Sequence, residues 1–93
     1  MKRLTHREEQ SAYRVETTTL FINENKYFGE AIDKLAKFEN FYEDLESQLT
    51  VITAEMDKLR EEDKSHSPRF KELFVKKMIN NNILTMLKYY GLE

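Results

Sequence analysis

The sequence predicts an all-α fold: a long central helix with a heptad pattern, an antiparallel C-terminal helix, and an N-terminal helix or arm, in a helical bundle completed by dimerisation. The first observation is that the 93-residue chain has only two Gly and one Pro, so its turns are few and its elements long. The second is an apolar heptad repeat through its middle, and the third is a Ser-Pro start and a Gly stop around its last part. A chain of this length is expected to form one helical domain, residues 1–93.

The N-terminal segment, residues 1–23, gives two conflicting signals. Thr5 and Glu8 have the spacing of a capping box, which satisfies the first backbone N–H groups of a helix. The YRVETTTLFI stretch that follows is rich in β-branched and aromatic residues and is also compatible with a short strand or an irregular arm. We favour a helix that starts near Thr5 and breaks near residues 23–25, with the strand as the alternative.

The central segment, residues 24–64, carries the strongest pattern. Its apolar residues follow one another at alternating intervals of three and four, which is the a/d pattern of helices packed at a shallow angle. They are Phe28, Ala31, Leu35, Phe38, Tyr42, Leu45, Leu49, Ile52, Met56 and Leu59. A helix over 28–59 would be about 48 Å long. In so short a chain such a helix needs a packing partner.

The apolar stripe narrows along this predicted helix. Tyr27, Ile32 and Phe41 widen it in the first half, whereas polar and charged residues flank it from Leu45 onward. A wide apolar face suits a bundle with several neighbours, and a narrow one suits a single facing helix. The first half is therefore predicted to form bundle core and the second half a two-helix contact.

The C-terminal helix, predicted over residues 67–91, has clear signals at both ends. Ser67 can cap its start, and Pro68 fits the first helical position because no backbone hydrogen bond is lost there. Gly91 fits a left-handed C-cap, with Leu92 folding back on Leu87 in a Schellman motif. Packed antiparallel, this helix would be about 34 Å long and would reach back only to around residue 40. The first half of the long helix then needs the N-terminal segment or a second copy of the chain.

The same helix has too many apolar residues for one buried face. Phe70, Phe74 and Met78 form one strip, and a second strip lies roughly opposite, so two packing partners are predicted. In the Asn80–Asn82 triplet the three side chains point in directions about 100° apart, and Asn82 is predicted to fix the register of a dimer contact. The predicted dimer interface comprises Phe28, Ile32, Phe41, Ile79, Asn82, Ile83, Met86 and Tyr90.

Charge is unevenly distributed along the chain. Residues 24–63 hold 12 acids and 5 bases, a net −7, whereas residues 64–93 hold 6 bases and 2 acids, a net +4. The basic residues with a predicted binding role are Arg69, Lys76, Lys77 and Lys88. Arg69, Lys76 and Lys77 spread around the helix instead of forming one stripe, so we favour salt bridges to the acidic helix over contacts with nucleic acid or with an acidic protein.

Catalytic and metal-binding signals are weak throughout. The chain has no Cys and two His, and neither His6 nor His66 has a second ligand at metal-binding spacing. The acid clusters fall off the heptad seam, and no glycine-rich phosphate loop or nucleophile motif occurs. We therefore expect no enzyme activity, no cofactor and no metal. Without a signal peptide or an apolar run of membrane-spanning length, we expect no membrane contact and a cytoplasmic location.

These observations favour a non-enzymatic protein-interaction module, such as a small adaptor, regulatory or assembly protein acting through a helical surface as a homodimer. The alternative is a nucleic-acid-binding regulator that uses the basic C-terminal helix of both subunits. A third, weaker hypothesis is an apolar ligand or lipid held between bundle helices.

Overall fold

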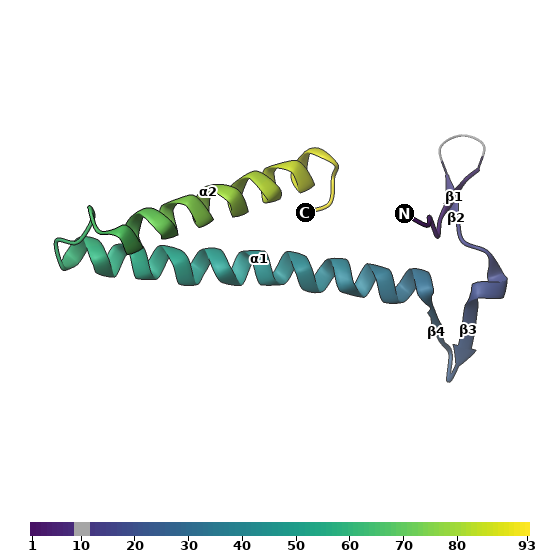
Figure 1. Ribbon diagram of the computed structural model, residues 1–93. Coiled ribbons are helices and arrows are strands. Elements are labelled where there is room, and N and C mark those ends of the chain that lie inside the picture. The colour runs from purple at the N-terminus through teal and green to yellow at the C-terminus, as the bar shows by residue number, and fades with distance from the viewer. Residues whose placement is uncertain (9–11) are drawn as a thin grey trace. The chain divides into compact units, whose positions relative to one another are not determined.

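The computed structural model describes residues 1–8 and 12–93, and the chain divides into two compact units, residues 1–40 and 41–93. The long helix α1 contributes residues to both units (Figure 1). In chain order the elements are β1 (His6–Arg7), β2 (Tyr13–Arg14), a 3₁₀ turn (Thr17–Thr19), β3 (Leu20–Asn23), β4 (Lys26–Gly29), α1 (Glu30–Glu61) and α2 (Pro68–Tyr89).

Two short antiparallel hairpins precede the helix in the first unit. β1 pairs with β2, with His6 opposite Arg14, and β3 pairs with β4, with Leu20 opposite Gly29. The β3–β4 turn consists of Glu24 and Asn25, both in the left-handed region with φ of 52° and 65°. Two consecutive positive φ angles are those of a type I′ turn, whose twist matches the twist of the flanking strands.

The predicted N-terminal helix is wrong, and the strand alternative is correct. The fold is mostly helical with two small antiparallel sheets, rather than all-α. Thr5 and Glu8 do not start a helix, because β1 begins at His6. An N-cap residue stabilises a helix by only about 1 kcal/mol. Here the β-branched and aromatic residues of the YRVETTTLFI stretch favour extended pairing instead.

The long helix also begins later than predicted, at Glu30 instead of residue 24. The residue before it, Gly29, has φ of 153°, and a Cβ placed there would lie 2.3 Å from the carbonyl oxygen of Thr19. Only glycine fits at this change from strand to helix. Phe28, predicted as the first heptad position and as a dimer contact, therefore belongs to β4, where it is exposed.

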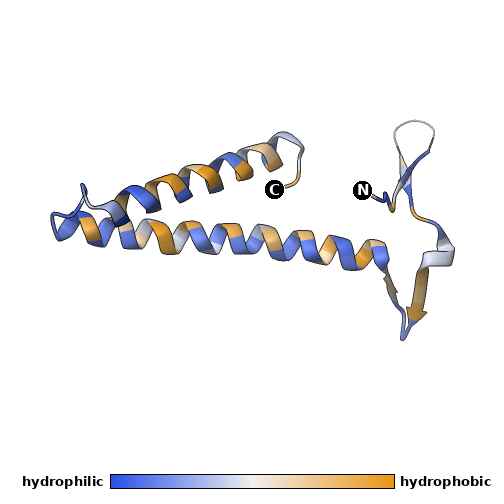
Figure 2. Ribbon diagram, in the orientation of Figure 1, coloured by the Kyte–Doolittle hydropathy of each residue, from blue (hydrophilic) through white to orange (hydrophobic). Residues whose placement is uncertain are grey.

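The second unit is a helical hairpin, as the heptad pattern predicts from Leu45 onward. The C-terminal part of α1 and the whole of α2 run antiparallel, with apolar residues recurring along both ribbons (Figure 2). The seam between them, which we call the hairpin seam, is formed by the buried side chains of Ile52, Met56 and Leu73, with Leu59 and Phe70 packed beside them. Leu45 of α1 is buried as well.

The predicted ends of α2 are confirmed. The backbone N–H of Phe70 donates to the Ser67 hydroxyl at 3.2 Å, and Pro68 occupies the first turn. At the other end, Leu92 N–H donates to the Leu87 carbonyl at 2.8 Å and Gly91 N–H to the Lys88 carbonyl at 2.9 Å. These two bonds are the pair that defines a Schellman motif.

The end of α1 has the same motif without a glycine. Lys64 N–H donates to the Leu59 carbonyl at 2.7 Å and Asp63 N–H to the Arg60 carbonyl at 3.0 Å. Asp63 takes the left-handed position with φ of 58°. An aspartate there adopts an unfavourable backbone conformation and places a negative charge at the negative end of the helix dipole.

We predict that Asp63→Gly stabilises the hairpin by about 0.5–1 kcal/mol, because glycine adopts positive φ without steric cost and the repulsive charge is removed. The measurement is denaturant unfolding followed by circular dichroism at one fixed protein concentration. Glu61→Gly, at the last residue of α1, is the control and should destabilise the hairpin by up to about 1 kcal/mol. Equal destabilisation by both variants would contradict this account of the helix end.

Candidate functional site

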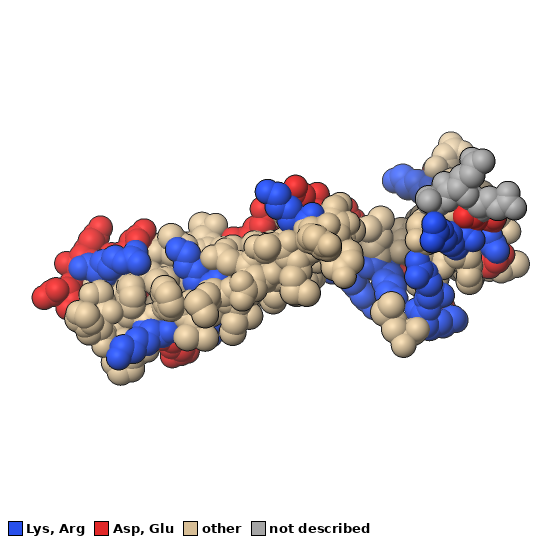
Figure 3. Space-filling model, turned by 90° about the horizontal axis from the view of Figure 1, so that it is seen from above, with Lys and Arg blue, Asp and Glu red and all other residues tan. Residues whose placement is uncertain are grey.

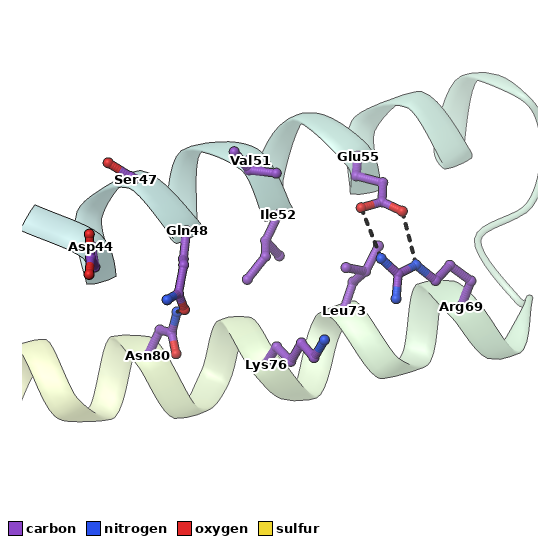
Figure 4. Close-up of a pocket in the computed structure, with 10 residues that line it drawn as sticks. All are labelled: Asp44, Ser47, Gln48, Val51, Ile52, Glu55, Arg69, Leu73, Lys76 and Asn80. Carbon is purple, nitrogen blue, oxygen red and sulfur yellow. Dashed lines mark hydrogen bonds and ion pairs between the residues drawn. The ribbon is translucent and has the colours of Figure 1, made fainter. Parts of the chain in front are cut away.

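A groove of about 550 Å³ runs along one side of the hairpin between α1 and α2 (Figure 4). We call it the hairpin groove. Ile52 and Leu73 from the hairpin seam form its apolar floor, and Val51 at its edge is 64% exposed. The full lining is Asp44, Ser47, Gln48, Val51, Ile52, Glu55, Arg69, Leu73, Lys76 and Asn80. The groove can therefore receive apolar side chains between two polar walls.

One amide pair crosses the groove between the helices. Asn80 Nδ2 donates to Gln48 Oε1 at 3.1 Å, and Asn80 is 8% exposed (Figure 4). Asn80 is buried and Gln48 is exposed, so the pair lies at the margin of the apolar contact, where it favours the register in which the two side chains meet. Asn82, which is predicted to set the register of a dimer contact, is exposed in the single chain. Asn80 follows the buried Leu73 by seven residues, and this heptad spacing is the signal that identifies it.

One ion pair also joins the helices at the groove. The Arg69 guanidinium donates to both oxygens of Glu55, from Nε at 2.9 Å and from Nη2 at 3.2 Å, and Nη1 lies 3.2 Å from Glu72 Oε1. These hydrogen bonds hold the pKa of the Glu55 carboxyl below its ordinary value and raise that of Arg69. The salt bridge between basic α2 and acidic α1 that the charge distribution predicts is thus present at Arg69.

The other predicted basic residues do not join Arg69 in one patch. Lys76 also lines the hairpin groove, and its Nζ lies 3.5 Å from Glu72 Oε1 on the same helix. Lys77 instead lines a second hollow, of about 160 Å³, which Phe74 and Met78 also line. Lys88 stands in the last turn of α2, where a cation is favourable at the negative end of the helix dipole.

The side chains predicted to form a dimer interface are largely uncovered. On α2, Ile79 and Met86 are 51% and 62% exposed, and Ile83 is partly buried. Tyr90, the C-cap residue of α2, is 72% exposed. On α1, Ile32 and Phe41 are 37% and 45% exposed. Figure 3, which looks down on the α2 side, shows a largely uncharged surface with separate Lys and Arg side chains.

Exposed large apolar side chains outnumber buried ones within residues 41–93. Four are buried, which are Leu45 and the three of the hairpin seam, and ten are exposed. The exposed ten are Phe41, Val51, Phe74, Val75, Met78, Ile79, Met86, Tyr89, Tyr90 and Leu92. Apolar surface gathered on this scale in a hairpin of two helices is typical of an interaction surface.

The groove lining supplies contact surface and paired charges and includes no histidine or cysteine. In residues 1–8 and 12–93, no group of three or more His, Cys, Asp or Glu side chains could hold a metal ion. Over the same residues, neither helix combines the length and apolar character needed to cross a membrane. No protein-family model, curated protein or solved structure matches the chain.

We predict that Glu55→Gln reduces the acid sensitivity of the hairpin. Because the pKa of Glu55 is lowered by folding, its ion pair stabilises the fold fully above the unfolded-state pKa of glutamate, about 4.3, and this stabilisation disappears as the pH falls through the lower folded-state value. The wild-type free energy of unfolding should therefore fall further between about pH 7 and pH 2 than that of the variant. Denaturant titrations across this range measure the difference.

Glu43→Gln, at an exposed position of the same helix, is the matched control and should keep the wild-type acid response. Identical pH profiles for wild type and Glu55→Gln would show that this ion pair adds no pH-dependent stability.

Proposed function

We propose that this chain is a non-enzymatic protein-interaction module whose working surface is the helical hairpin of residues 41–93. The observation that supports this most strongly is the excess of exposed over buried apolar side chains in that hairpin. Burying apolar surface is the main favourable term in most protein association, at about 25 cal/mol per Å². A partner that covers this surface would gain stability that the hairpin cannot obtain alone.

The hairpin groove is the part of this surface best suited to a partner. Its floor is apolar, and its rim carries the Glu55–Arg69 ion pair and the Gln48–Asn80 amide pair, which are already satisfied within the chain. An apolar centre with a polar rim is the usual anatomy of a protein interface. Because Glu55 and Arg69 are paired with each other within the chain, a partner can cover these two charges without leaving either of them unpaired.

The alternative function, nucleic-acid binding through α2, has less support. Arg69 is held by Glu55 and Glu72, and Lys77 lies away from the groove that Lys76 lines. Phosphate contacts need cations that can be directed together at a backbone. A stripe of that kind is not formed by these residues.

A further hollow, with basic residues in its lining, lies beside β1 and β2, and it gives nucleic-acid binding no stronger support. Its lining includes Arg3, Tyr13 and Arg14. Arg14 is paired with Glu8 and with Glu16, and the Arg3 guanidinium carbon lies 5.3 Å from the centre of the Tyr13 ring. These contacts within the chain engage groups that would otherwise meet a phosphate.

We predict that a tagged chain retains a protein through the hairpin groove, either an untagged copy or another protein of the native host. Val51→Glu should abolish the retention, because it places a charge at the apolar edge of the groove. Met78→Glu is the matched control, since Met78 is also exposed on this hairpin but lines the second hollow. Co-purification with the three tagged chains, quantified by mass spectrometry, measures the difference.

Retention of no protein, or of the same proteins by all three chains, would contradict the proposed function. Binding to duplex or single-stranded nucleic acid that weakens steeply with added salt would support the alternative instead.

A further inference from the structure

We infer that the partner covering the hairpin groove is a second copy of this chain, seated so that each α1 lies beside the other copy's α2 in a four-helix bundle. This inference rests on the proposed function and names its partner. In the inferred arrangement, a two-fold axis runs along the groove, and the two connections between α1 and α2 lie at the same end of the bundle.

The first argument is the charge of the two helices. Within residues 41–63, eight acids and two bases give a net −6, whereas α2 has five bases and one acid, a net +4. With the axis along the groove, every helix has neighbours of opposite net charge only. With the axis across the groove, the two α1 helices would pack directly on each other with like charge, which is unfavourable.

The charges on the groove walls have the same signs as the net charges of their helices. The wall from α1 carries Asp44 and Glu55, and the wall from α2 carries Arg69 and Lys76 (Figure 4). A rotation about an axis along the groove places the acidic wall of one copy over the basic wall of the other. A self-complementary surface of this kind is what an isologous two-fold interface requires.

The second argument is the apolar surface beside the groove. Ile79 and Ile83 follow Lys76 by three and seven residues, so they continue the α2 wall along the same side of the helix. Val51 contributes exposed apolar surface from the α1 side. A second hairpin laid along the groove would cover these three side chains together, of which Val51 and Ile79 are exposed and Ile83 is partly buried in the single chain.

The connection between α1 and α2 also makes the arrangement measurable. The chain has no cysteine, so His66→Cys creates a single labelling position in the exposed connection between α1 and α2. In the inferred bundle, two spin labels at this position lie at the same end. In the opposite arrangement, with the two α2 helices overlapping along their full length, they are separated by about the length of the 22-residue α2, roughly 33 Å.

The test combines mass and distance. Light scattering of the full chain at micromolar concentration should give twice the 11.2 kDa chain mass for wild type and for Met78→Glu. Val51→Glu should give the single-chain mass, with circular dichroism reporting whether it remains helical. Electron-spin distance measurement on labelled His66→Cys, which leaves the groove intact, should give a separation well below about 33 Å.

A single-chain mass for wild type, dissociation by Met78→Glu in place of Val51→Glu, or label separations at or above the length of α2 would each overturn the inference. If wild type is a single chain but still retains another protein through Val51, the second copy is excluded while the proposed function stands. If wild type is a single chain and retains no protein, both the second copy and the proposed function are contradicted.

Discussion

The contact on which residues 41–93 depend is the hairpin seam, where Ile52 and Met56 of α1 pack against Leu73 of α2. Only three buried apolar side chains form this seam, so apolar burial within one chain gives the two-helix hairpin little stabilisation. The helix ends and the polar contacts of this unit matter for that reason, because each adds a small stabilising contact or restricts how the two helices can align.

The helix ends and the polar contacts restrict the hairpin to one alignment. Ser67 and the two Schellman motifs satisfy backbone groups where the helices begin and end, so neither helix can easily shift or lengthen. The Gln48–Asn80 amide pair is made in one register only, and the Glu55–Arg69 pair closes the same side nearer the connection. Apolar contacts alone would tolerate sliding by a turn, whereas these contacts would not.

The sequence predicts the helical hairpin well because its signals are local and repeated. The heptad from Leu45 onward, the Ser-Pro start and the Gly91 stop each correspond to a feature of the structure. The N-terminal prediction fails because a single capping-box match competes with a longer stretch that has strand preference, and because the turn at residues 24–25 is Glu-Asn, which lacks the usual glycine. The groove could not be predicted in detail, since it depends on which residues of two distant helices meet, although the Leu73–Asn80 spacing indicates one of them.

The central proposal is that the stability of the hairpin depends on covering its groove with a second copy. Thermal unfolding of the full chain over a roughly hundredfold range of protein concentration tests this claim most directly, because association that involves only the folded chain makes the midpoint depend on concentration. The account predicts that the midpoint rises steadily with concentration. A midpoint that stays constant over the whole range, with a cooperative transition at every concentration, would contradict it.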